Sequence, residues 1–217
     1  MKPRTYSLIS SGEGLVVEKK SRFLSIAIPI ASEDDAAALI QARRKEHYDA
    51  RHNCFAYVIG DENGVRRCSD DGEPSQTAGI PILEAIDAAS VQNALVIVTR
   101  YFGGTLLGTG GLTRAYRESA ADALKNAEKI ARMLGKELTA SLDYTSYGKL
   151  EYLLREKSIP VLDSSFGQDV TIKCMIPEED TGSILDAITQ MTAGRAVCEY
   201  SDTKTYGLTD DNKVVML

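Results

Sequence analysis

One stretch near the middle of the chain, LVIVTRYFGGTLLGTGG, runs from Leu95 to Gly111 and sets the order of the elements around it. Its first four residues form a continuous apolar run, which is typical of a buried central strand. Glycine-rich sequence follows, and glycine at that density costs backbone entropy unless the loop needs a close backbone approach or positive φ. After the loop, small and apolar residues recur at steps of three and four, which predicts a helix with one face on a sheet; these residues are Leu112, Ala115, Tyr116, Ser119, Ala120, Ala123, Leu124 and Ala127.

Regular elements are also predicted on the amino-terminal side of this stretch. Ser32 is followed by three acidic residues, which is the pattern of a helix start because a hydroxyl and acids stabilise free N–H groups. The tetrapeptide Asp61-Glu62-Asn63-Gly64 predicts a hairpin turn. The expected elements are strands over 14–18, 23–30, 52–59 and 65–69, and helices over 32–46 and 81–89.

The pattern restarts after about residue 130. The predicted strands are 137–144, 159–165, 169–176 and 195–200, and the predicted helices are 147–157 and 178–191. This β-α-β-β-α-β order predicts a ferredoxin-like domain, and the tail from Ser201 either adds an edge strand or stays loose. We therefore expect an α+β protein of two domains, residues 1–133 and residues 134–217.

Charge supports the same division. The 217 residues carry a net charge of −6, yet residues 1–135 hold 17 basic and 17 acidic residues, so all the excess lies in the last third. That balance argues against a C-terminal domain that grips phosphates by bulk charge. The chain has no apolar run near 18 residues, no apolar leader and no CxxC pair among its four cysteines. These features predict a cytoplasmic protein with reduced thiols and no membrane partner.

The glycine-rich loop is the first candidate site. It follows a strand and opens a helix, so free N–H groups and the helix dipole favour a bound anion. Neither a Walker sequence nor GxGxxG is present, and a tight turn with close packing is the alternative. The residues expected to bind an anion or nucleic acid are Arg100, Gly103, Gly104, Gly108, Gly110, Gly111, Arg114 and Arg117.

The acidic loop, CSDDGEPSQTAG over residues 68–79, is the second candidate. Asp70, Asp71 and Glu73 could hold a hard cation or move protons. The sequence favours a plainer interpretation, in which these residues cap turns, lead into the next helix and pair with Arg66, Arg67 or Arg100. No metal site and no cofactor is firmly predicted.

His52 and Cys54 alternate along one strand and therefore face the same side. A Cys–His nucleophilic pair is one interpretation, and a buried cysteine that serves the core is the favoured one. No catalytic residue is assigned. The side chains expected to line a cleft between the two loops are His52, Cys54, Ser75 and Thr77.

These motifs resemble, in order, those of the YigZ/IMPACT family: His52-Asn53-Cys54, Ser69-Asp70-Asp71-Gly72-Glu73-Pro74, Thr77-Ala78-Gly79 and Thr99-Arg100-Tyr101-Phe102-Gly103-Gly104. The resemblance covers about residues 18–125, and the rest is similar to the C-terminal domain of bacterial YigZ-type members. It implies a first βαβ-type domain similar to the second domain of a small-subunit ribosomal protein, and a ferredoxin-like domain similar to one in elongation factor G. Gln76 departs from the family pattern, which usually has glycine there.

The resemblance implies a translation-associated regulatory protein that binds RNA, the ribosome or a translation factor, and it leans against catalysis. The alternative is an enzyme for a small phosphorylated or nucleotide-like substrate, in which the glycine loop binds the anion and the acidic loop supplies a metal or a proton. A third interpretation is a protein-interaction module that docks through the acidic C-terminal domain.

Overall fold

The computed structural model describes residues 5–60, 64–209 and 211–217. It is a mixed α and β structure that separates into two compact units, Met1–Ile130 and Ala131–Leu217. The turn predicted over 61–64 lies mostly outside the described residues. No helix in the described part of the chain is both long enough and apolar enough to cross a membrane.

A five-stranded antiparallel sheet forms the centre of the first unit, in the order β2-β3-β7-β4-β5. These strands are β2 (Gly12–Glu18), β3 (Ser21–Pro29), β4 (His52–Ile59), β5 (Val65–Ser69) and β7 (Ala94–Tyr101). The predicted run 95–98 is the buried middle of β7, which confirms a central strand. The strand continues further than predicted because Arg100 is paired with both Phe23 and His52. Thr99, Arg100 and Tyr101 therefore belong to the strand and not to the glycine-rich loop that follows it.

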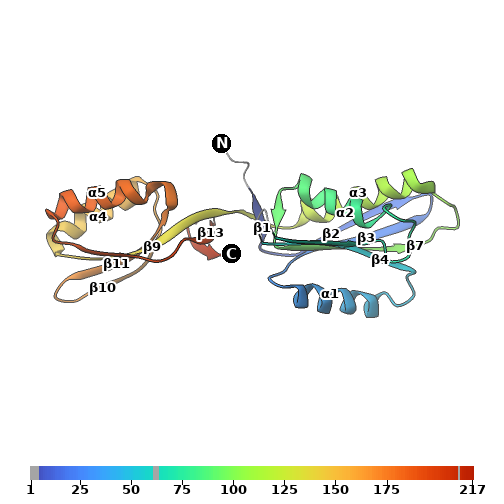
Figure 1. Ribbon diagram of the computed structural model, residues 1–217, viewed down its shortest axis with the longest axis horizontal. Helices are drawn as coiled ribbons and strands as arrows, with labels where there is room; N and C mark the ends of the chain where they lie inside the picture. Colours follow the sequence, from blue (N-terminus) through green and yellow to red (C-terminus); the bar gives the residue numbers. More distant parts are fainter. Residues whose placement is uncertain (1–4, 61–63, 210) are drawn as a thin grey trace. The chain divides into compact units, whose positions relative to one another are not determined.

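Helices cover both faces of this sheet. Helix α1 (Glu33–Glu46) lies on one face, and α2 (Gly79–Ala88) and α3 (Gly108–Asn126) lie on the other (Figure 1). The Ser32 side chain caps α1 by accepting the N–H of Asp35 at 3.1 Å, as its sequence predicts. The predicted face of α3 is buried along its length. The small residues let α3 approach β2 closely, since a Cβ on Gly14 would lie 2.6 Å from the Ala123 nitrogen.

A small three-stranded sheet completes the first unit, in the order β6-β1-β8. Its strands are β1 (Tyr6–Leu8), β6 (Val91–Gln92) and β8 (Lys129–Ala131), and none of them was predicted. Strands of two or three residues are too short to show a period, so only their pairing in the folded chain defines them.

The second unit has the predicted element order. It contains β9 (Met133–Leu142), α4 (Tyr144–Glu156), β10 (Val161–Phe166), β11 (Val170–Pro177), η1 (Glu178–Asp180), α5 (Thr181–Thr192) and β12 (Val197–Tyr200). Strand β9 lies between β11 and β12, and β10 pairs with the outer side of β11. Helices α4 and α5 lie together on one face of this sheet (Figure 1).

The C-terminal tail adds strands to the second unit. Strand β13 (Lys204–Leu208) pairs with the start of β9, and β14 (Val214–Met216) pairs with β13. Tyr206 is fully buried in this addition. Of the two interpretations of the tail, the structure therefore supports added strands.

Candidate functional site

Asp70 organises the acidic loop. The residue before α2, Ala78, has no side chain that can cap the helix. The carboxylate of Asp70, nine residues before Gly79, caps it instead. It accepts the backbone N–H of Gln76 at 2.8 Å, of Ala78 at 3.0 Å and of Gly79 at 2.8 Å. Burial alone would raise the pKa of Asp70, but these hydrogen bonds outweigh burial and lower the pKa. The capping interpretation of Asp70 is confirmed.

We expect Asp70→Ala to lower the free energy of unfolding at pH 7 by about 1–2 kcal/mol, as loss of a helix cap does. A lowered folded pKa means that the contribution is complete above the ordinary value of 3.8 and is lost as the pH falls through the folded value. Urea unfolding of wild type and variant at several pH values should show the difference shrinking below pH 3.8. The exposed Asp186→Ala on α5 is the control. An equal difference at every pH would contradict the assignment.

Asp71 turns away from Asp70 and braces other elements. Its carboxylate accepts the N–H of Asn53 at 2.7 Å and a guanidinium N–H of Arg44 at 2.5 Å. Its carbonyl oxygen lies 2.9 Å from His52 Nδ1. The acidic side chains are thus occupied separately, and the described residues contain no group of His, Cys, Asp and Glu suited to a metal ion. Of the two interpretations of the acidic loop, the structure therefore favours the one in which Asp70 and Asp71 hold backbone N–H groups.

Glu73 points inward and forms a buried network. One oxygen, Oε1, accepts Nη1–H of Arg100 at 2.7 Å and the hydroxyl of Tyr116 at 2.7 Å. The Glu73 and Arg100 side chains are only 3% and 7% exposed. Of the three arginines predicted to pair with the acidic loop, Arg100 is the one that does so. One donor of Arg100, Nη1–H, is therefore already used by a buried carboxylate.

Cys54 belongs to the core. It is fully buried, and Sγ donates to the Asp70 carbonyl oxygen at 3.0 Å and to the Tyr116 hydroxyl at 3.3 Å. Burial raises the pKa of the thiol far above its ordinary value, so the thiolate needed for nucleophilic attack is disfavoured. The structure therefore favours the core interpretation over a Cys–His nucleophile.

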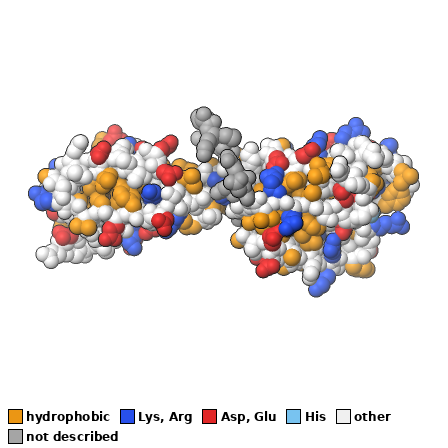
Figure 2. Space-filling model, in the orientation of Figure 1, with side chains coloured by type: hydrophobic (Ala, Val, Ile, Leu, Met, Phe, Trp, Pro, Cys, Tyr) orange, Lys and Arg blue, Asp and Glu red, His pale blue; other side chains and the backbone are white. Residues whose placement is uncertain are grey.

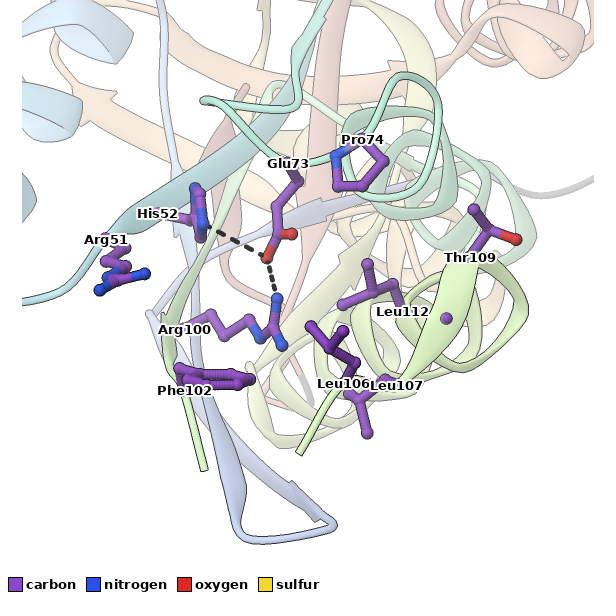
Figure 3. A pocket seen from close by; sticks show the side chains of 11 residues that line it. Arg51, His52, Glu73, Pro74, Arg100, Phe102, Leu106, Leu107, Thr109 and Leu112 are labelled. Atoms are coloured by element: carbon purple, nitrogen blue, oxygen red, sulfur yellow. Dashed lines mark hydrogen bonds and ion pairs between the residues drawn. The ribbon is translucent and has the colours of Figure 1, made fainter. Parts of the chain in front are cut away.

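The two loops converge on one cavity of about 440 Å³ in the first unit (Figure 3). Polar side chains from the start of β4 and the residue before it, from the acidic loop and from β7 line one part, and leucines from the glycine-rich loop and α3 line another. The lining residues are Arg51, His52, Glu73, Pro74, Arg100, Phe102, Leu106, Leu107, Gly108, Thr109 and Leu112. Such a cavity, largely apolar with a few polar groups, is the usual form of a ligand site.

The start of α3 forms part of this wall. Leu107 provides no capping side chain, and the first turn contains no acidic residue. Gly108 has a φ of +69°, and no atom lies within 4 Å of the position that a Cβ on Gly108 or Gly110 would occupy. The N–H groups of the first turn therefore lack a side-chain partner there and make a favourable place for an anion.

The other predicted anion-binding residues fall into different roles. Gly103 packs against the turn between β2 and β3, and Gly104 has a φ of +87°. Arg117 pairs with Glu84, and neither Arg114 nor Arg117 lines the cavity. Gly110 and Gly111 belong to the first turn of α3 and not to a loop. Both arginines lie apart from the cavity, because they are on the exposed face of α3 and not in its first turn.

The predicted cleft residues are also divided by the structure. His52 lines the cavity, whereas Cys54 and Thr77 are buried and Ser75 is exposed outside it. Sequence reasoning missed the positions that complete the wall, which are Arg51, Pro74, Phe102, Leu106, Leu107, Thr109 and Leu112. Large apolar side chains within a glycine-rich loop were the available signal, since a solvated turn does not need them.

Gln76 has a φ of +63°, the left-handed region that glycine adopts most easily. Its N–H donates to Asp70, and its side chain is exposed. Backbone conformation thus accounts for a glycine at this place in the family pattern without any ligand contact.

Comparisons with known proteins agree on one group of relatives. The family description "Impact N-terminal domain" matches residues 19–124, and "Domain of unknown function (DUF1949)" matches residues 141–195. "IMPACT family member YvyE" of Bacillus subtilis is 36% identical, over 97% of this chain and 94% of the relative. "IMPACT family member YigZ" of Escherichia coli is 35% identical, over 78% of this chain and 85% of the relative. A solved structure described as "Crystal structure of an hypothetical protein" is 28% identical, covers 91% of this chain and 97% of its own, and has a TM-score of 0.58.

Proposed function

The chain belongs to the IMPACT family, and from this membership and the cavity we propose that it is a cytoplasmic regulator of translation that binds RNA without catalysis. In this proposal the first unit is similar to the second domain of a small-subunit ribosomal protein. The second unit is ferredoxin-like and similar to a domain of elongation factor G. Both likenesses would suit a protein that works beside the ribosome.

The observation that carries the proposal is the lining of the cavity. It brings the uncapped start of α3 and the exposed Arg51 close to the ring of Phe102, which is 47% exposed. Among the described residues Arg51 forms no ion pair, so its charge is available. Cationic groups that meet phosphate, next to an aromatic ring that meets a base, are the usual means of binding single-stranded RNA.

The surface charge argues for a local contact of this kind. On the face drawn in Figure 2, positive and negative side chains are mixed over both units. A protein of this charge gains little from long-range attraction to RNA. We therefore expect the logarithm of RNA affinity to fall with the logarithm of salt concentration with a slope of about −0.7 to −1.4, as for one or two phosphate contacts on a single strand.

The test is equilibrium binding of single-stranded RNA and of ribosomes at two salt concentrations. We expect Arg51→Ala with Phe102→Ala to weaken binding by at least about tenfold, since one stacking contact alone contributes about 1–3 kcal/mol. The matched control is Arg155→Ala with Phe166→Ala, which removes an exposed arginine and a 58% exposed phenylalanine from the second unit. Equal affinity of wild type, variant and control would refute the proposal.

A second candidate, an enzyme for a small phosphorylated substrate, is favoured by one contact. His52 Nε2 lies 4.0 Å from Glu73 Oε1 beside the cavity, so a base and a carboxylate face the same space. A panel of nucleotides and sugar phosphates, with and without magnesium, should be incubated with the protein and analysed for products. Turnover that is lost in His52→Gln would replace the binding proposal with this one.

A further inference from the structure

We propose that the cavity of the first unit is a subsite for one nucleoside monophosphate, with the phosphate at the start of α3 and the base against the apolar wall. The inference rests on the proposed function and deepens it by naming the chemical unit that the site takes. A free nucleotide and one nucleotide of an RNA chain present the same chemistry, and the experiment below separates these two sources.

The phosphate end is defined by the start of α3. Gly108 and Thr109 line the cavity, and the N–H groups of this first turn have neither a capping side chain nor a nearby carboxylate on the helix. The helix extends over 19 residues, so its dipole is fully developed at this end. The guanidinium of Arg51 forms no ion pair among the described residues and lies on the other side of the same cavity, beside His52 (Figure 3).

Arg100 gives an independent sign of a missing partner. A guanidinium has five N–H donors, and this one uses Nη1 alone, for Glu73. Its Nε is buried and has no hydrogen-bond partner in the described structure. The side chain as a whole is only 7% exposed, so water does not take the partner's place freely. Figure 3 shows the Arg100 side chain extending into the space between Glu73, Phe102 and the leucines. A buried cation that keeps unused donors beside a cavity favours a polar or anionic ligand there.

The remaining wall fits a base better than it fits a second charge. Phe102 and three leucines, Leu106, Leu107 and Leu112, supply apolar surface, and Leu106 is 83% exposed without a ligand. A cavity of about 440 Å³ lies within the range of about 300–1,000 Å³ that small-molecule sites have. Inorganic phosphate would leave this apolar wall in water, whereas a nucleotide would cover it.

His52 provides a specific contact for the base or the ribose. Its Nδ1 lies 2.9 Å from the carbonyl oxygen of Asp71, which can only accept, so Nδ1 carries the proton. In the neutral ring Nε2 is therefore an acceptor, and it lines the cavity at 4.0 Å from Glu73. This nitrogen can accept a hydrogen bond from an amino group of a base or from a ribose hydroxyl.

Thr109→Asp tests the phosphate end without loss of the fold. A carboxylate in the first turn stabilises a helix, so the melting temperature should stay level or rise, while a bound phosphate is repelled. We expect adenosine, guanosine, cytidine and uridine 5′-monophosphates to bind wild type at least tenfold more tightly than the matching nucleosides. Thr109→Asp should lose at least tenfold for the monophosphates and little for the nucleosides. Thr109→Asn separates loss of the hydroxyl from gain of charge, and Thr181→Asp at the start of α5 is the control in the second unit.

Competition with labelled single-stranded RNA separates the sources. If a monophosphate binds and displaces RNA, the cavity holds one nucleotide of the RNA. If a monophosphate binds but the protein binds no RNA, the cavity is a subsite for free nucleotides and the proposed function is refuted. If RNA binds with no effect of Thr109→Asp and no monophosphate binds, the subsite is refuted and the proposed function survives. Inorganic phosphate binding as tightly as the monophosphates would refute the base contact.

Discussion

Glu73→Ala is expected to lower the free energy of unfolding of the first unit by about 3–5 kcal/mol, because removing one member of a buried ion pair leaves the other charge uncompensated. The carboxylate is the only described hydrogen-bond partner of the Arg100 guanidinium, and it also accepts the Tyr116 hydroxyl. Both side chains of the pair are less than a tenth exposed, so the pair is weakly screened by solvent.

The matched control is the exposed pair formed by Glu84 and Arg117. Its side chains are 51% and 50% exposed, and it joins α2 to α3 in the same unit. Glu84→Ala should cost less than about 1 kcal/mol, because solvent screens an exposed pair. Urea unfolding followed by circular dichroism, with a separate transition for each unit, measures both costs. A Glu73→Ala cost as small as that of Glu84→Ala would contradict the buried network.

A double-mutant cycle separates the pair from its parts. Arg100→Met removes the charge and keeps an unbranched apolar chain between Phe23 and Phe102, whose rings lie 5.5 Å and 5.6 Å from the guanidinium carbon. Glu73→Gln with Arg100→Met should therefore cost less than the two single variants added together. If the costs simply add, Glu73 and Arg100 act independently and do not form the buried pair.

The fold was predictable where periodicity is strong. The apolar run 95–98 and the recurring small residues of α3 each define a buried face without help from the rest of the chain. Arg100 could not be placed that way, since an isolated arginine is a surface residue. It lies in a buried strand only because Glu73, 27 residues earlier, is brought to it by the acidic loop. That pairing is a property of the tertiary structure.

The candidate site was predicted in outline and not in detail. The glycine-rich and acidic loops do meet, but the side chains at the cavity are mostly not the charged ones that suggested a site. The carboxylates of Asp70 and Asp71 accept hydrogen bonds from backbone N–H groups and do not line the cavity. Arg51 and Phe102, which were not predicted, do line it. Arg51 belongs to no recognisable motif, and Phe102 lies in the family motif without a role that the motif assigns to it. Each becomes notable only because it lies next to a strand, Arg51 just before β4 and Phe102 just after β7, at the cavity that the start of α3 also lines.

Gly103→Ala is expected to lower the free energy of unfolding by about 2 kcal/mol or more, as overpacking against a rigid neighbour does. A Cβ on Gly103 would lie 2.1 Å from the carbonyl carbon of Lys20 and 2.2 Å from the nitrogen of Ser21. Lys19 and Lys20 form the tight turn between β2 and β3, and both have positive φ, so this backbone has few other conformations. Gly103 also donates its N–H to the Ser21 hydroxyl at 3.1 Å, which holds the two segments together.

Gly110→Ala is the matched substitution in the same glycine-rich stretch. No atom lies within 4 Å of its Cβ position, and the residue is already helical, so alanine should raise stability by up to about 1 kcal/mol. Thermal unfolding and RNA binding of both variants then separate the two uses of glycine in this segment. Gly103 allows a close backbone approach, whereas the glycines of α3 leave the helix start open. If Gly103→Ala unfolds like wild type and loses RNA binding, Gly103 contacts the ligand and its packing role is wrong.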